Sequence, residues 1–175
     1  MLLRYYQKLD DAISYLLSSV CNEKKLLKSN LGNKINYVDI GTNEGNFLKF
    51  INNNFELKKV ICFEPVKVLS EKLKKKFNGK NFHINQVALS DKKGLRKFYE
   101  YDISSQSSLY EQNNTFKSLK KLKKISRVET ISFDEFFRKD IKIDFCKIDV
   151  QGEETKVLKK MKNNLKKKNF KLLKI

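Results

Sequence analysis

The sequence predicts an α/β fold in which a mostly parallel, Rossmann-like sheet carries helices on both faces. Three observations support this prediction. Buried strands expected at 36–41 and 58–64 are joined by a glycine-containing turn and a helical pattern over 46–51. Strands and helices keep alternating along the chain, and the strand expected at 143–150 is mostly apolar. The sequence has no repeat and no linker, so we divide it into an N-terminal helical segment, 1–35, and one α/β domain, 36–175.

The first half of the chain can be assigned element by element. A helix is expected over 3–28 and is broken at Leu31-Gly32-Asn33. Pro65 fits the first turn of a helix over 66–77. After the Asn78-Gly79 turn, one strand is expected over 81–89 and another, alternating strand over 95–101.

The second half begins with a polar loop over 102–114, a basic helix over 116–125 and a short strand over 128–131. Ser132-Phe-Asp-Glu135 is a capping-box pattern that opens a short helix ending at Phe137. After strand 143–150, Glu153 and Glu154 favour the start of a helix whose apolar stripe continues to Leu165. A fifth strand is expected to begin at about Phe170. It would form an apolar sheet edge through which two copies of the chain could associate.

Composition limits the functional classes. A chain of 175 residues fits one domain, and no apolar run approaches the roughly 20 residues of a membrane span. Cys21, Cys62 and Cys146 fit no zinc site or disulfide framework, so we expect reduced thiols, no metal and a cytoplasmic location. The net charge is +18, but only 4 of the 38 basic residues are arginines. Because nucleic-acid sites favour arginine, we expect no specific nucleic-acid site.

The turn after the first strand has the pattern Gly41-x-Asn43-x-Gly45 and lacks the third glycine of a dinucleotide fingerprint. Asp39 and Glu44 lie beside it, and carboxylates there would repel a pyrophosphate. They suit a ligand that carries an ammonium and a sulfonium, which describes S-adenosylmethionine (SAM). A glycine turn that binds another ligand, or none, is the alternative.

Glu64 ends the second strand, where an acid can accept hydrogen bonds from both ribose hydroxyls. In a parallel sheet, ligands bind at the carboxyl ends of the strands near the point where the strand order reverses. This rule brings the Gly41–Gly45 turn, Glu64, Ala88 and Asp149 to one cleft. The sequence therefore predicts a SAM-type nucleoside site there.

With these elements assigned, the chain resembles the FkbM-type SAM-dependent methyltransferases. The resemblance covers 37 to about 175 and rests on ordered blocks: Val38-Asp-Ile-Gly-Thr-Asn-Glu-Gly45, Phe63-Glu-Pro65, Val87-Ala-Leu-Ser-Asp91, Ser107-Ser-Leu109, Val128-Glu-Thr-Ile-Ser-Phe-Asp-Glu-Phe136 and Ile143-Asp-Phe-Cys-Lys-Ile-Asp-Val-Gln-Gly152. It implies a class I methyltransferase fold and O-methylation of a hydroxyl on a sugar, glycan or polyketide-like natural product. Because such a sheet has two further strands, we expect a domain that stops after the start of strand five.

The resemblance also implies roles for individual residues. The cofactor-binding set is Asp39, Gly41, Asn43, Gly45, Glu64 and Ala88. Lys147 and Gln151 are expected beside the acceptor, and Asp149 is the candidate general base. Gln151 replaces a glutamate of many members. A structural ion pair is the alternative role for Lys147 and Asp149.

Two other functions stay open. A domain that binds SAM, or only a partner, with weak catalysis is one, and an RNA ribose methyltransferase is the other. The single proline, Pro65, is followed by Val66, so the Pro-Pro and Pro-Cys signatures of base methylation are absent.

Overall fold

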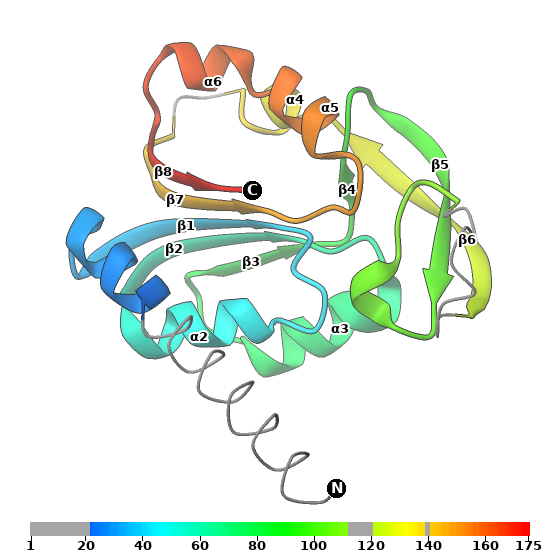
Figure 1. The fold of residues 1–175 in the computed structure, drawn as a ribbon, viewed down its shortest axis with the longest axis horizontal. Helices are drawn as coiled ribbons and strands as arrows, with labels where there is room; N and C mark the ends of the chain where they lie inside the picture. The colour runs from blue at the N-terminus through cyan, green and yellow to red at the C-terminus, as the bar shows by residue number, and fades with distance from the viewer. Residues whose placement is uncertain (1–21, 112–120, 139–140) are drawn as a thin grey trace, which may run out of the picture.

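The computed structural model describes residues 22–111, 121–138 and 141–175 (Figure 1). Its main sheet has five strands in the order β3-β2-β1-β7-β8, and every neighbouring pair is parallel. These strands are β1 (Lys34–Ile40), β2 (Glu56–Phe63), β3 (Phe82–Asn85), β7 (Ile143–Ile148) and β8 (Phe170–Lys174). The strand order reverses between β1 and β7. The predicted α/β class with a mostly parallel sheet is therefore confirmed.

Helices cover both faces of this sheet (Figure 1). One face carries α2 (Asn46–Asn54), α3 (Lys67–Lys76) and a helix over 22–30. The other carries α4 (Phe133–Phe136), α5 (Glu154–Lys159) and α6 (Lys162–Lys166). Side chains along β1 alternate between the two faces of the sheet, and each face has its own hydrophobic core. Tyr37 packs in the core on the side of α2 and α3, whereas Val38 and Ile40 pack in the core on the side of α4 and α5.

A smaller sheet stands beside the main one, with the order β4-β6-β5. It consists of β4 (Ala88–Leu89), β5 (Gly94–Tyr101) and β6 (Leu122–Ile131). β5 and β6 form an antiparallel hairpin, and β4 pairs with β6 in parallel. A short 3-10 helix, η1 (Ser104–Gln106), follows β5.

Three element predictions were wrong in detail. The single strand expected over 81–89 is two strands in different sheets, because β3 pairs with β2 only as far as Asn85 and Ala88 then pairs with Thr130. Residues 122–125 of the expected helix 116–125 belong to β6, and 116–120 lie outside the described residues. Cross-strand pairing with β5 decides this segment and overrides the helical preference of its lysines.

The third error concerns the helix expected from Glu153 to Leu165, which divides into α5 and α6. Asp134 explains the break. Its backbone N–H donates to the Lys160 carbonyl, and its carboxylate accepts hydrogen bonds from Asn163 N–H and the Asn164 amide. These contacts cap α6 separately. The capping box at Ser132 and Glu135 forms as predicted.

The helix expected over 3–28 is described only from 22, and it extends to 30. The remainder of that prediction, and Cys21, lie outside the described residues. Cys62 and Cys146 are buried free thiols. None of the described helices is long and apolar enough to cross a membrane.

Candidate functional site

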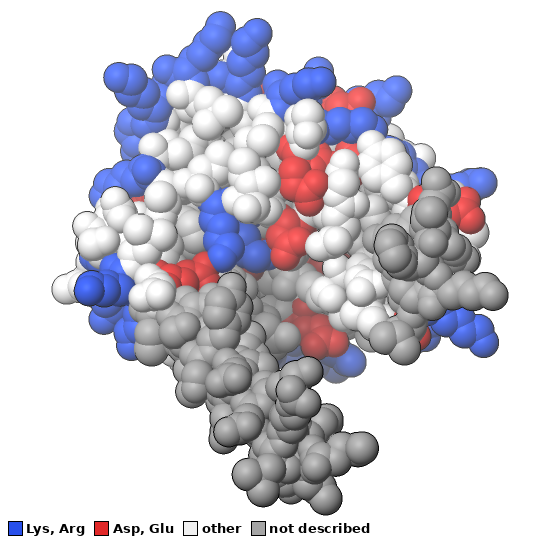
Figure 2. All heavy atoms as spheres, viewed as in Figure 1, with Lys and Arg blue, Asp and Glu red and all other residues white. Residues whose placement is uncertain are grey.

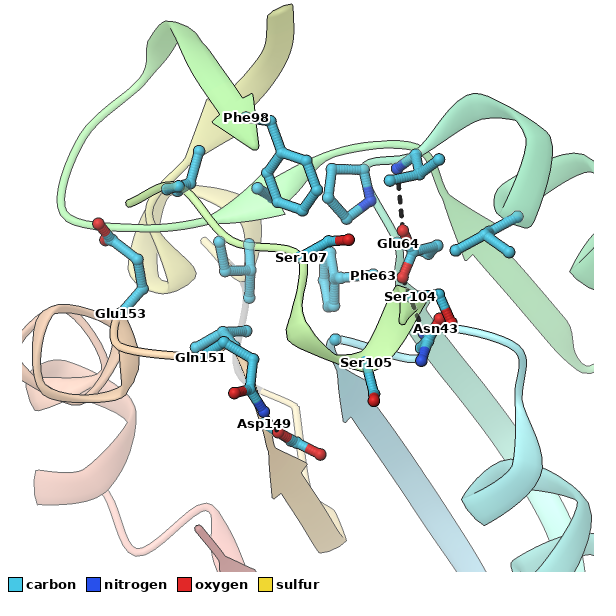
Figure 3. A pocket seen from close by; sticks show the side chains of 18 residues that line it. Asn43, Phe63, Glu64, Phe98, Ser104, Ser105, Ser107, Asp149, Gln151 and Glu153 are labelled. Atoms are coloured by element: carbon cyan, nitrogen blue, oxygen red, sulfur yellow. Dashed lines mark hydrogen bonds between the residues drawn. The ribbon is translucent and has the colours of Figure 1, made fainter. Parts of the chain in front are cut away.

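A pocket of ≈ 640 Å³, including space open to solvent, lies at the carboxyl ends of β1, β2 and β7 (Figure 3). One wall is apolar and consists of Phe63, Pro65, Val66, Leu69, Ala88, Leu89, Phe98 and Leu109. Polar side chains line the rest: Asn43, Glu64, Ser104, Ser105, Ser107, Asp149, Gln151 and Glu153.

The glycine turn brings β1 close to the end of β7. Gly41 has φ 80°, and a Cβ atom there would lie 2.0 Å from the Asp149 carbonyl oxygen. The Gly41 and Thr42 N–H groups both donate to the Phe63 carbonyl, which joins the turn to β2. Only glycine allows this left-handed turn and this close approach at position 41.

Gly45 has a different structural role. It does not line the pocket, and it also has a left-handed φ, 76°. A Cβ atom there would lie 2.6 Å from Leu73 Cδ2 and 3.1 Å from Phe77 Cε2. Gly45 thus lets the start of α2 pack against the α3 segment.

Glu64 is 5% exposed, and its two carboxylate oxygens have separate partners. Oε2 accepts a hydrogen bond from Asn43 N–H at 2.8 Å, and Oε1 accepts one from Val66 N–H at 2.9 Å. Figure 3 shows both bonds at the pocket wall. Burial raises the pKa of Glu64 to about 7, although the two backbone donors act in the opposite direction. Each oxygen keeps a further lone pair for a ligand donor.

Behind the pocket, Lys147 joins two carboxylates. Its Nζ lies 3.7 Å from Asp39 Oδ1 and 3.2 Å from Asp149 Oδ2. Asp39 is fully buried, and burial raises its pKa to about 6 although Lys147 lowers it. The Tyr37 hydroxyl faces the same carboxylate, but neither Asp39 oxygen makes a hydrogen bond of normal geometry with a described residue. Lys147 is therefore the main stabilising partner of the buried Asp39 charge.

Asp149 differs from Asp39 because its side chain is 50% exposed and lines the pocket. It accepts a hydrogen bond from the Gln151 amide at 2.9 Å. Gln151 has φ 50°, and the adjoining loop is fixed by Glu154, which accepts bonds from Val150 N–H and Gly152 N–H. The loop thus presents Asp149 and Gln151 together at the pocket.

Sequence reasoning missed one group of residues. Ser90 and Glu153 are both buried, and their side chains are 2.5 Å apart in a hydrogen bond. Arg96 donates to Ser90 at 2.8 Å and to Glu153 at 3.0 Å. Burial alone would raise the pKa of Glu153, but these bonds hold it below its usual value. The only sequence signal was Ser90 in the Ala-Leu-Ser-Asp block.

The segment around η1 is the second feature that sequence reasoning resolved poorly. Ser104 and Ser105 line the pocket beside Ser107, and Ser104 donates to Glu44 at 3.3 Å. Ser107 belongs to one of the blocks that carry the family resemblance, whereas nothing in the sequence singled out the other two. Ser108 instead donates to the Gln151 carbonyl at 2.7 Å.

The charged side chains that line the pocket are acidic, whereas the chain as a whole is basic. Among the described residues, its charged lining side chains are Glu64, Asp149 and Glu153, with no lysine or arginine, although Lys147 pairs with Asp149 and Arg96 with Glu153. The chain as a whole has a net charge of +18. In the view of Figure 2, acidic side chains lie mostly near the middle of the visible face of the molecule and basic ones mostly around its rim. A cationic ligand is favoured in such a pocket.

The structure thus brings together most of the predicted site residues. Gly41, Asn43, Glu64, Ala88, Asp149 and Gln151 line the pocket. Asp39, Gly45 and Lys147 do not, although Lys147 lines a second, more open hollow that shares Asp149.

Comparison with known proteins identifies the family. The Methyltransferase FkbM domain matches residues 39–175. No curated protein matches the chain. Among solved structures, it is similar to a methyltransferase FkbM from Methylobacillus flagellatus KT, with a TM-score of 0.52 and 14% sequence identity. That similarity covers 77% of this chain and 31% of the other, so the chain spans about a third of the length of that protein. With its domain matched over most of its length, the chain belongs to the FkbM methyltransferase family.

Proposed function

We propose that this chain is a SAM-dependent O-methyltransferase that acts on a hydroxyl of a sugar, glycan or polyketide-like natural product. The acidic pocket is the observation that carries the proposal. Of the residues that the structure describes, three carboxylates and no basic side chain line it, within a chain of net charge +18. SAM has two positive groups, a sulfonium and an ammonium, and one negative carboxylate. Its net positive charge is therefore complementary to the acidic side chains of this lining.

The pocket residues also offer hydrogen-bonding groups and an apolar surface to SAM. Glu64 would accept both ribose hydroxyls with the lone pairs left free by Asn43 N–H and Val66 N–H. The apolar wall that includes Leu69 and Ala88 would contact the adenine ring. The buried Asn43 Oδ1 has no hydrogen-bond partner among the described residues, so it can accept one from a ligand.

SAM supplies an electrophilic methyl group whose sulfonium charge is lost as the methyl group is transferred. The protein residues then have two tasks. With SAM and the acceptor bound, the apolar wall would help to exclude water from the reacting centre. Asp149, half exposed at the junction of the two hollows, would accept the proton of the acceptor hydroxyl, directly or through water. Lys147 and Gln151 hold that carboxylate in place.

Titration calorimetry tests the cofactor assignment. SAM should bind at a one-to-one ratio, whereas NAD should not bind, because the carboxylates repel its pyrophosphate. Binding of NAD in preference to SAM would contradict the proposal.

A transfer assay with radiolabelled methyl-SAM and a panel of sugars tests the reaction. Label should enter a hydroxyl, and Asp149→Asn should lower turnover by about 100-fold or more, a much larger effect than its loss of SAM affinity. SAM binding with no transfer to any acceptor would instead favour the catalytically weak, SAM-binding domain.

A further inference from the structure

The outer face of the β5–β6 hairpin has a composition that the cofactor pocket does not explain. Side chains along these paired strands alternate between two faces. The inner face contains Phe98, which lines the pocket, and Val128, which is buried. The outer face contains the cross-strand pairs Leu95–Glu129, Lys97–Arg127 and Tyr99–Ile125.

Two aliphatic side chains on this outer face are largely exposed. Leu95 is 59% exposed and Ile125 is 52% exposed. Tyr99 lies opposite Ile125 and is half-buried. These apolar groups share one face of the hairpin with Lys97 and Arg127.

Between them lies a pair of like charges. Lys97 and Arg127 are direct cross-strand partners, an arrangement that destabilises an isolated hairpin. Neither makes an ion pair or a side-chain hydrogen bond with another described residue, although Glu129 lies diagonally across from Lys97. An anionic partner would relieve this repulsion.

We propose that this outer face, formed by Leu95, Lys97, Tyr99, Ile125, Arg127 and Glu129, docks on an anionic lipid surface. Aliphatic side chains would enter the headgroup boundary, Tyr99 would lie at the interface, and the two cations would contact acidic headgroups. Docking would hold the hairpin, whose inner face forms part of the pocket wall, at the membrane surface.

The same residues disfavour two other occupants. A twofold contact between copies of the chain would bring the Lys97–Arg127 pair of one copy against the same pair of the other. The phosphates of a nucleic acid could pair with these cations, but they make no apolar contact with Leu95 and Ile125. Binding of bases by stacking uses several aromatic side chains, and this face has only Tyr99.

Co-sedimentation with phosphatidylcholine vesicles, with and without phosphatidylglycerol, tests the proposal. The chain should bind only the vesicles that contain phosphatidylglycerol. The double variant Leu95→Ser, Ile125→Ser, which leaves the charge unchanged, should weaken binding by about tenfold or more. The charge-reversing variant Lys97→Glu, Arg127→Glu should weaken it at least as much.

Matched controls separate this face from general adsorption of a basic chain. Leu26→Ser, Val68→Ser removes aliphatic groups of similar exposure, 59% and 55%. Lys74→Glu, Lys75→Glu makes the same charge change on α3. Both control variants should weaken binding by less than about threefold.

Several results would overturn the proposal. These are no binding to phosphatidylglycerol vesicles at low salt, equal loss in the control variants, or full binding after Leu95→Ser, Ile125→Ser. Self-association or binding of single-stranded polyuridine that these substitutions abolish, without lipid binding, would assign the face to another partner. None of these results depends on whether the pocket binds SAM.

Discussion

The protonation of Glu64 should control SAM affinity. Its carboxylate must be ionised to accept both ribose hydroxyls, but burial raises its pKa to about 7. Binding below that pH therefore requires the loss of a proton. With a pKa of about 7, the carboxyl is about 90% protonated at pH 6 and about 10% at pH 8, so affinity should fall roughly tenfold, about 1.4 kcal/mol, between pH 8 and pH 6.

Glu64→Gln is the matching perturbation. It keeps the shape of the side chain but removes the charge, and its amide N–H₂ would face either Asn43 N–H or Val66 N–H, donor against donor. Loss of charge-assisted bonds to the ribose should weaken SAM binding by about 2–3 kcal/mol at pH 8.

Titration calorimetry from pH 6 to pH 8 measures both effects. Since an α-amino group titrates near pH 7.7–8.0, the cofactor itself adds some pH dependence. The ratio of wild-type to variant affinities at each pH isolates the contribution of Glu64, and this ratio should shrink as pH falls. Glu71→Gln, at an exposed position on α3, is the control and should leave the affinity unchanged. A ratio that stays constant from pH 6 to pH 8 would refute the reasoning.

Three further predictions concern stability, each measured by urea denaturation. Gly41→Ala should destabilise the fold by about 3 kcal/mol, because φ is 80° and the new Cβ would overlap the Asp149 carbonyl oxygen; a change below about 1 kcal/mol would contradict this. Lys147→Met should cost about 3–5 kcal/mol at pH 8, because it leaves the Asp39 carboxylate buried without its cation. Since burial already raises the pKa of Asp39 to about 6, that loss should be smaller at pH 5, where the folded state holds the proton; an equal loss at both pH values would argue against the pair. Ser90→Ala should cost about 1.5–3 kcal/mol by removing a bond to the buried carboxylate that precedes α5, and an unchanged midpoint would show that this bond contributes nothing.

The sequence predicted the main sheet because its signals are local. Buried strands around Val38 and Ile61 are apolar and short, and Gly41 and Pro65 mark where strands end. Topological rules then placed Glu64 and Asp149 at one edge of the sheet, and both line the pocket.

The elements that were predicted wrongly depend on distant partners. Leu122–Ile125 is a strand because it pairs with β5, and this pairing overrides the local preference of its lysines for helix. The break between α5 and α6 depends on Asp134, about thirty residues earlier in the chain.

The site shows the same division between local and long-range information. Gly45 carries a motif signal, but its contact with the Leu73 side chain is a packing constraint that the motif alone could not distinguish from ligand contact. The bond between Ser90 and Glu153 joins residues 63 positions apart, so spacing gave no indication of it.

A crystal structure of the chain with S-adenosylhomocysteine, the demethylated product, tests the central claim most directly. The account predicts that both ribose hydroxyl oxygens lie about 2.5–3.0 Å from the two Glu64 carboxylate oxygens, with the adenine ring against the wall that includes Ala88. The sulfur should face Asp149. A ligand bound with its ribose away from Glu64, or bound outside this pocket, would contradict the account.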